Sequence, residues 1–226
     1  MWFIEGKNFQ NWQSGGNSFL WLNGFAGCGK SVLCSIAIQH AMRQSCNNPA
    51  DVGIAFFYFE FNDESKQCAS GMLRALVLQL SEQHQECHTY LSQLHRTHQS
   101  SSPPNEVLLE YLQDMIRRFD QVYVFLDALD ESARTKERET VLETVTTMRA
   151  WGIPDLHLLV TSRDELDIRR SLSLGSHQDI SLRNDGVQSD LERYISDKLR
   201  TSPNLRRWER YHDQIKQALL KQAQGV

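Results

Sequence analysis

The feature that most constrains the fold is a glycine-rich stretch enclosed between two different hydrophobic patterns. Residues 24–31 read GFAGCGKS and match the spacing G-x-x-x-x-G-K-[ST] through Gly24, Gly29, Lys30 and Ser31. The stretch before them, SFLWLN, is a short run of β-formers, and the stretch after them, VLCSIAIQHAM, places apolar side chains at helical spacing. A strand, a glycine turn and a helix in direct succession predict one unit of a parallel α/β sheet.

This succession is suited to holding a phosphate group. Glycines let the backbone curl so that consecutive N–H groups face one anion, and the start of the helix adds the positive end of its dipole. Lys30 is expected to reach the β- and γ-phosphates, and Ser31 is expected to bind Mg²⁺. Cys28 is interpreted as a small loop residue rather than a nucleophile, because no base is placed to activate it. The predicted nucleotide-binding residues are Gly24, Phe25, Ala26, Gly27, Cys28, Gly29, Lys30, Ser31 and Val32.

Further β-rich runs alternate with amphipathic segments along the chain. The predicted strands are Ser18–Asn23, Gly53–Phe61, Gln121–Asp127, Leu156–Ser162 and Gln178–Leu182. Several of them are apolar nearly throughout, as expected for parallel strands that are buried on both faces. Between them, apolar residues recur every three or four positions, which indicates helices with one buried face. The alternation predicts right-handed strand–helix–strand units in a three-layer α/β fold.

The strand pattern stops near residue 184, and only helical periodicity follows. Two helical stripes, separated at Ser202-Pro203, make up the rest of the chain. We therefore expect a helical lead-in over residues 1–17, a nucleotide-binding domain over 18–184 and the start of a helical subdomain over 185–226. Because this subdomain ends before it closes, and the first residues read as a helix entered midway, we expect the chain to be the core of a longer protein.

Composition narrows the partners and the compartment. A formal net charge of -4 argues against a nucleic-acid-binding face, which is usually basic. The five cysteines form no C-x-x-C pair, which is typical of a reducing compartment. The apolar runs are too short to span a bilayer, and the N-terminus lacks the pattern of a signal peptide. These features predict a cytoplasmic protein without membrane or nucleic-acid partners.

A second motif lies in the run QVYVFLDALDES. Asp127 ends a series of β-formers, and its carboxylate is expected to hold Mg²⁺, directly or through water. Many P-loop ATPases place a catalytic glutamate directly after this aspartate, but here the position is Ala128. The next carboxylates are Asp130 and Glu131, and one of them is expected to orient or deprotonate the attacking water. The spacing does not decide which of the two does so.

A third motif ends the run LHLLVTSRDE. Thr161, Ser162 and Arg163 close a predicted strand, and Arg163 is predicted to sense the γ-phosphate. The alternative is an arginine that caps the strand and pairs with Asp164 or Glu165.

Together, Gly24–Ser31, Asp127–Glu131 and Thr161–Arg163 resemble the NACHT family of STAND NTPases, which are the nucleotide switches of NOD-like receptors. The small residue after Asp127, followed by Leu129-Asp130-Glu131, favours NACHT proteins over neighbouring AAA-type groups. Flanking phrases such as WFIEGKNFQNW and LLVTSRDE are most similar to fungal members. The resemblance covers essentially residues 2–225.

The resemblance implies a parallel five-stranded sheet of order 5-1-4-3-2 with a C-terminal helical extension. That order would bring Lys30, Asp127 and Arg163 around one γ-phosphate. It also implies slow, Mg²⁺-dependent hydrolysis of bound nucleotide, self-association in the activated full-length protein, and effector and repeat domains in cis. The nucleotide is ATP/ADP or GTP/GDP, and the absence of an Asn-Lys-x-Asp run favours adenine. The predicted function is a switch that controls oligomerisation in cell death or innate immunity. The alternative is a turnover P-loop enzyme, such as a small-molecule kinase or a motor-type ATPase.

Overall fold

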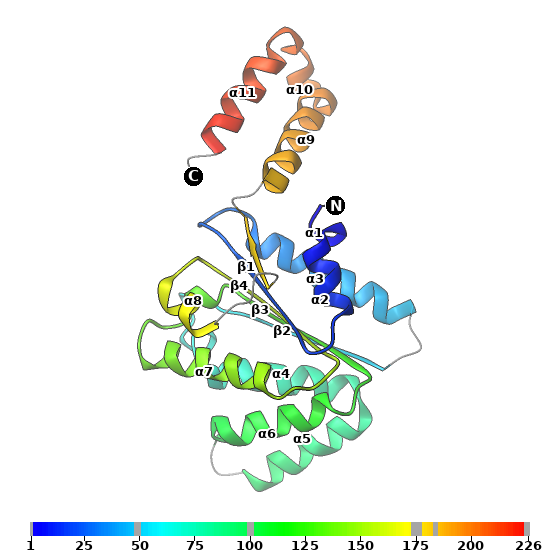
Figure 1. Ribbon diagram of the computed structural model, residues 1–226, viewed down its shortest axis with the longest axis vertical. Helices are drawn as coiled ribbons and strands as arrows, with labels where there is room; N and C mark the ends of the chain where they lie inside the picture. The colour runs from blue at the N-terminus through cyan, green and yellow to red at the C-terminus, as the bar shows by residue number, and fades with distance from the viewer. Residues whose placement is uncertain (1, 48–50, 99–101, 173–177, 183–184, 224–226) are drawn as a thin grey trace.

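Helices cover both faces of one central parallel sheet (Figure 1). The computed structural model describes residues 2–47, 51–98, 102–172, 178–182 and 185–223. The strands are β1 (Ser18–Asn23), β2 (Val52–Tyr58), β3 (Gln121–Asp127), β4 (Leu156–Ser162) and β5 (Asp179–Ser181). The helices are α1 (Trp2–Glu5), α2 (Lys7–Ser14), α3 (Lys30–Asn47), α4 (Ala69–Gln83), α5 (Gln85–Thr97), α6 (Asn105–Ile116), α7 (Lys136–Ala150), α8 (Leu166–Leu172), α9 (Asp185–Thr201), α10 (Pro203–Arg206) and α11 (His212–Ala223).

The strand order is β2-β3-β4-β1-β5, and every pairing is parallel. This is the predicted order 5-1-4-3-2 counted from the other edge, so the fold expectation is confirmed. Placing β4 between β1 and β3 sets the ends of these strands side by side, since Asn23 pairs with Ser162 and Leu126 with Val160. Parallel strands share their carboxyl edge, where α/β proteins bind ligands.

The predicted bounds of β1, β3 and β4 agree with the structure, whereas those of β2 and β5 differ. The predicted β2 extends three residues too far, to Phe61. The regular strand ends at Tyr58, although the Phe59 N–H still donates to the Asp127 carbonyl at 3.0 Å. Asp63 then caps a short 3₁₀ turn, because its carboxylate accepts from the Ser65 N–H at 3.0 Å. The local turn therefore overrides the β-propensity of the aromatic run.

One face of the sheet is covered by α1, α2 and α3 (Figure 1). Trp12 of α2 is buried there and donates its indole N–H to the Leu158 carbonyl of β4 at 3.1 Å. Its ring also packs against Tyr123 and His157, with centroids 5.7 and 5.9 Å away. The segment expected as a lead-in thus packs directly on the sheet.

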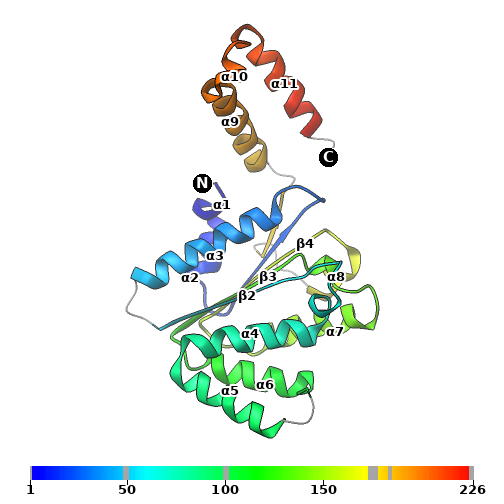
Figure 2. The same ribbon diagram turned by 180° about the vertical axis from the view of Figure 1, so that it is seen from behind.

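The opposite face is covered by α4, α7 and α8, and α5 and α6 lie outside α4 (Figure 2). The apolar stripes of α4, α7 and α8 meet the outward side chains of the central strands, as in a doubly covered parallel sheet. The helices expected from periodicity correspond to α3, α4, α6, α7 and α9. The second C-terminal stripe, expected as one helix, is divided into α10, a 3₁₀ turn (η3, Glu209–Tyr211) and α11.

The exposed edge of β2 is closed by two glutamines from successive turns of α4. The Gln79 amide accepts from the Phe56 N–H at 3.0 Å and donates to the Phe56 carbonyl at 2.8 Å. The Gln83 amide does the same with Ile54, at 2.8 and 2.6 Å. Side chains thus occupy backbone groups that another strand could otherwise pair with.

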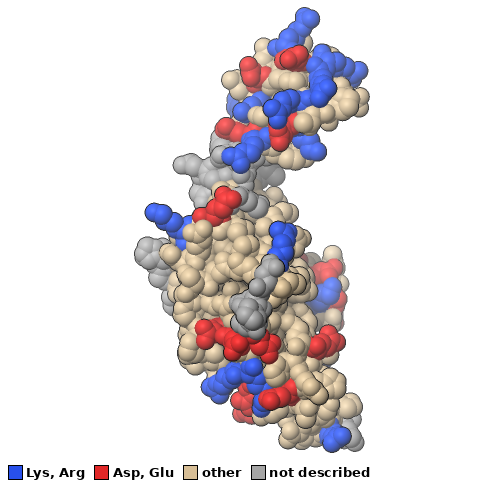
Figure 3. Space-filling view, turned by 90° about the vertical axis from the view of Figure 1, so that its right-hand side faces the viewer, with Lys and Arg blue, Asp and Glu red and all other residues tan. Residues whose placement is uncertain are grey.

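Helices α9, α10 and α11 project beyond the sheet as a helical extension (Figures 1 and 2). Lys and Arg side chains gather on this extension in the space-filling view (Figure 3). The predicted interruption at Ser202-Pro203 is present, because α10 begins at Pro203. The expected domain boundary at residue 184 lies outside the described residues.

Candidate functional site

The glycine loop connects β1 to α3 at the carboxyl edge of the sheet. Gly27 and Gly29 have φ angles of +77° and +93°, in a region that only glycine enters readily. A side chain at Gly24 would meet Cys28 Sγ at 2.7 Å. Helix α3 begins at Lys30, and its first turn contains no acidic residue. The loop therefore ends in a helix N-terminus whose dipole favours an anion.

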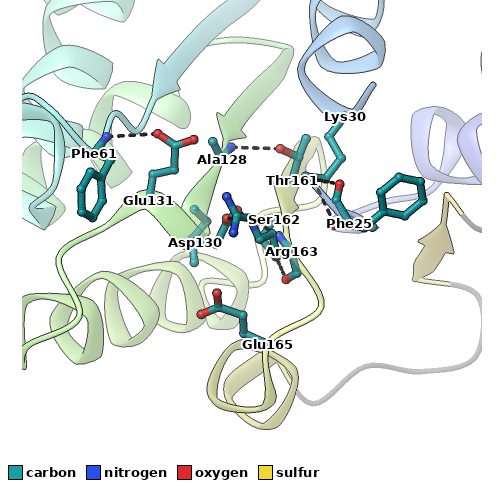
Figure 4. Close-up of polar contacts among 12 residues, drawn as sticks. Phe25, Lys30, Phe61, Ala128, Asp130, Glu131, Thr161, Ser162, Arg163 and Glu165 are labelled. Atoms are coloured by element: carbon teal, nitrogen blue, oxygen red, sulfur yellow. Dashed lines mark hydrogen bonds and ion pairs between the residues drawn. The ribbon is translucent and has the colours of Figure 1, made fainter. Parts of the chain in front are cut away.

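Lys30 bridges the two ends of the loop. Its ammonium donates to the Phe25 carbonyl at 2.8 Å and to the Gly24 carbonyl at 3.1 Å, and it lies 3.8 Å from Cys28 Sγ. These contacts hold a positive charge against the curled backbone (Figure 4). A compact ammonium is well suited to a phosphate, which it recognises as a point charge.

Asp127 ends β3 and is buried. Its Oδ1 accepts from the Thr161 hydroxyl at 2.6 Å, and that hydroxyl accepts from the Ala128 N–H at 2.9 Å. This chain of hydrogen bonds fixes the carboxylate against the end of β4. Burial, together with the nearby Asp127 carboxylate, raises the pKa of the Cys34 thiol on α3 well above its ordinary value. Cys34 is therefore a neutral, unreactive thiol at physiological pH.

The chain turns sharply after Asp127. Ala128 adopts a left-handed conformation with φ 56° and ψ 45°, which costs a non-glycine residue about 1–2 kcal/mol. The turn leads into a 3₁₀ segment (η2, Leu129–Glu131) and brings Asp130 back toward the end of β4. Local strain is thus stored directly beside the predicted metal ligand.

Asp130 is held by Arg163 through both of its carboxylate oxygens. The Arg163 backbone N–H donates to Oδ1 at 2.9 Å, and the Arg163 Nε lies 3.0 Å from Oδ2. The Asp130 side chain is 5% exposed, whereas that of Arg163 is 51% exposed. The alternative pairing of Arg163 with Asp164 or Glu165 is not the one observed. Asp164 pairs with Arg169, and Glu165 pairs with Arg134 and Arg138.

Glu131 faces a different neighbour. Its Oε2 accepts from the Phe61 N–H at 3.0 Å, on the segment that follows β2 (Figure 4). Asp130 and Glu131 are adjacent in the sequence, but their carboxylates contact different partners. Asp130 is engaged with an arginine, and Glu131 is oriented by a single neutral backbone donor.

These elements enclose one cleft of about 310 Å³. Its size falls at the lower end of the range for small-ligand sites. Gly24, Phe25 and Cys28 are not among its lining residues, and all three contact Lys30 instead. Asp127 is not among them either. The cleft is lined by Ala26, Gly27, Gly29, Lys30, Ser31, Val32, Ala128, Asp130, Glu131 and Arg163.

One buried residue beside the site was not predicted from the sequence. Arg138 lies in the first turn of α7, and its side chain is 4% exposed. It precedes the buried Val141, Leu142 and Val145 by three, four and seven positions, so it lies on the buried face of the helix. That spacing is the signal which could have revealed its burial.

The fold and the phosphate loop together define the class of P-loop NTPases. A family model described as Nephrocystin 3, N-terminal, matches residues 1–163, and the chain belongs to this family. No curated protein matches the sequence.

Solved structures with the same fold include two ORC structures that contain DNA. The Aeropyrum pernix ORC1 protein in complex with DNA is 14% identical with a TM-score of 0.50, and the match covers 73% of this chain and 39% of that one. Drosophila ORC bound to DNA is 12% identical with a TM-score of 0.51, and the match covers 95% of this chain and 50% of that one. This chain thus spans half or less of these proteins. At such identities the likeness concerns the fold alone.

Two further observations concern the described residues. None of their helices combines the length and the apolar character needed to cross a bilayer. Among the same residues, no group of three or more His, Cys, Asp and Glu side chains is arranged to hold a metal ion.

Proposed function

We propose that the chain is a nucleotide switch of the NACHT type, which binds ATP or GTP with Mg²⁺ and hydrolyses it slowly. One observation carries the proposal. A single cleft joins the phosphate loop, through Lys30 and Ser31, to Glu131 and to Arg163 at the neighbouring strand ends. A triphosphate in this cleft would have a cationic loop on one side and a second cation near its terminal phosphate. Such a site can distinguish a triphosphate from a diphosphate.

The residues present fit a bound Mg²⁺. Ser31 lies in the first turn of α3, and Cys34 lies one turn further along the same helix. The buried Asp127 carboxylate is close to Cys34, and therefore to this end of α3. Hydroxyl and carboxylate oxygens are the ligands that this cation prefers, and Mg²⁺ usually keeps several waters and phosphate oxygens as well. When bound, the cation would neutralise charge on the phosphates. Thr161 would keep the Asp127 carboxylate in place through its hydrogen bond.

The arrangement of carboxylates supports the proposal of slow turnover. Ala128 occupies the position where many P-loop ATPases place a catalytic glutamate, and Asp130 is committed to Arg163. Glu131 is left to orient the water from a position that is also held by the Phe61 N–H.

The proposal extends to a longer protein. We place the nucleotide-binding domain over residues 18–184, between a helical lead-in (1–17) and the beginning of a helical subdomain (185–226). In a fungal NOD-like protein this core would connect an N-terminal effector to C-terminal repeats. The bound nucleotide would control self-association, and through it cell death or innate immunity. The same proposal assigns the protein to the cytoplasm.

Titration calorimetry tests the binding step. With Mg²⁺ present, the chain is expected to bind ATP or GTP, and Lys30→Ala is expected to abolish the signal. Charge-assisted hydrogen bonds contribute about 1.5–3 kcal/mol each, so losing two of them weakens binding by about 10²–10⁴-fold. Lys221→Ala is the matched control, because this exposed lysine lies on α11, outside the cleft. Equal binding by the Lys30→Ala and Lys221→Ala chains would refute the proposal.

A phosphate-release assay tests the switch against a turnover enzyme. The expected rate is well below the roughly 10 s⁻¹ that is typical of dedicated enzymes. Fast steady turnover would instead favour an enzyme that consumes its nucleotide.

A further inference from the structure

The guanidinium of Arg138 connects the two segments that carry Asp130 and Arg163. It is almost entirely buried, with its side chain 4% exposed. A buried charge of this kind is tolerated only when it is paired and hydrogen-bonded. Its partners therefore show which parts of the structure it holds together.

On one side, Arg138 binds the connection between β3 and α7. Its Nη2 donates to the carbonyl of Ser132 at 2.9 Å and to the carbonyl of Asp130, and its Nε donates to the Ser132 hydroxyl at 3.1 Å. Ser132 is itself buried, and its hydroxyl donates to the Leu129 carbonyl at 2.7 Å. These bonds fix the backbone at the residue whose carboxylate holds Arg163.

On the other side, Arg138 binds the connection between β4 and α8. Its Nη1 donates to Glu165 Oε2 at 2.6 Å and lies 3.5 Å from Asp167 Oδ2. Glu165 comes two residues after Arg163, and Figure 4 shows it beside the Asp130–Arg163 pair. Arg138 thus contacts the chain on both flanks of that pair, but it does not line the cleft.

We propose that Arg138 is a positioning residue, which sets the Asp130–Arg163 pair so that the Arg163 guanidinium meets the terminal phosphate of a bound triphosphate. This inference rests on the proposed nucleotide-binding function. The planar guanidinium offers donors in fixed directions, so it can bridge backbone carbonyls and a carboxylate at once. A lysine would keep the charge but could not reproduce this geometry.

The test measures the ratio of triphosphate to diphosphate affinity by calorimetry, on the full chain with Mg²⁺. It uses ATP and ADP, or GTP and GDP if the chain binds guanine nucleotides instead. Arg138→Lys is expected to lower this ratio about tenfold, while the affinity for the diphosphate stays within about twofold. Arg134→Lys is the matched control, because Arg134 also pairs with Glu165 but is 69% exposed. The control is expected to leave the ratio unchanged. Ser132→Ala removes the acceptor of the Nε bond and is expected to lower the ratio in the same direction.

A double variant separates positioning from a general structural role. If Arg138 acts through Arg163, then Arg163→Ala alone lowers the ratio, and adding Arg138→Lys to it lowers the ratio no further. Additive losses, or an unchanged ratio in Arg138→Lys and Ser132→Ala chains of normal thermal stability, would overturn the inference. Should Arg138→Lys fail to fold, Ser132→Ala combined with Arg163→Ala gives the same comparison. Failure of the unmodified chain to bind either the adenine or the guanine nucleotides would instead refute the proposed function.

Discussion

Replacing Asp130 and Glu131 one at a time by their amides separates the roles of two adjacent carboxylates. Asp130 accepts from the Arg163 backbone N–H and lies against its Nε, at 2.9 and 3.0 Å. In Asp130→Asn, one of these donors faces an amide NH₂ group instead of an oxygen. Glu131 accepts a single bond from the Phe61 N–H at 3.0 Å. In Glu131→Gln, the amide oxygen can still accept that bond.

The magnitudes follow from these contacts. Losing one of these charge-assisted hydrogen bonds costs about 1–3 kcal/mol, and each kcal/mol shifts the Tm of a domain this size by about 2–4 °C. Asp130→Asn is therefore expected to lower the Tm by about 2–12 °C, and to keep turnover at saturating nucleotide within about tenfold. Glu131→Gln is expected to leave the free energy of unfolding within about 0.5 kcal/mol, because the bond from the Phe61 N–H is kept. It should slow hydrolysis by about 10²–10⁴-fold, or about 3–5 kcal/mol in the barrier.

Two assays on the same preparations test whether Asp130 acts in stability and Glu131 in turnover. They are thermal unfolding without nucleotide and phosphate release at saturating nucleotide. The expected pattern is a crossed one, in which one amide changes stability and the other changes turnover. The opposite pattern would refute the assignment of Glu131 as the residue that orients water. That pattern is an Asp130→Asn chain of normal stability with no turnover, beside a Glu131→Gln chain of normal turnover.

Two further predictions concern stability. Gln79→Leu with Gln83→Leu removes four hydrogen bonds from the edge of β2, at about 0.5–1.5 kcal/mol each. Chemical denaturation should show a loss of about 2–6 kcal/mol, and light scattering should show concentration-dependent association; an unchanged midpoint would contradict this role of the glutamines. Burial lowers the pKa of His157, so below about pH 6.5 the unfolded chain binds more protons than the folded one, and stability falls as the pH falls through this range. The His157→Gln chain should lose less stability than the unmodified chain between about pH 7 and pH 5. Some loss should remain because burial also lowers the pKa of His40. An equal loss of stability in both chains would show that His157 is not responsible.

Much of the fold could be predicted because its signals are local. Strand β1, the glycine loop and the start of α3 follow one another directly, and each depends on residues a few positions apart. The bounds of β3 and β4 were predictable for the same reason, since buried parallel strands form continuous apolar runs. The order of the strands is not a local property. It came from the resemblance of the motifs, because periodicity does not say which parallel strands pair.

The sequence by itself determined the phosphate loop and the side chains that could surround a nucleotide. Only the tertiary structure decided which partner each side chain has. Arg163 pairs with Asp130, Glu131 accepts from the Phe61 N–H, and Arg138 is buried between the β3–α7 and β4–α8 connections. Asp130 and Arg163 follow the ends of two different strands, β3 and β4, and the sheet order brings those ends together. Local patterns fix what each segment becomes, because they depend on neighbouring residues. Partners that are distant along the chain depend on how β3 and β4 pack, and therefore follow from the folded sheet.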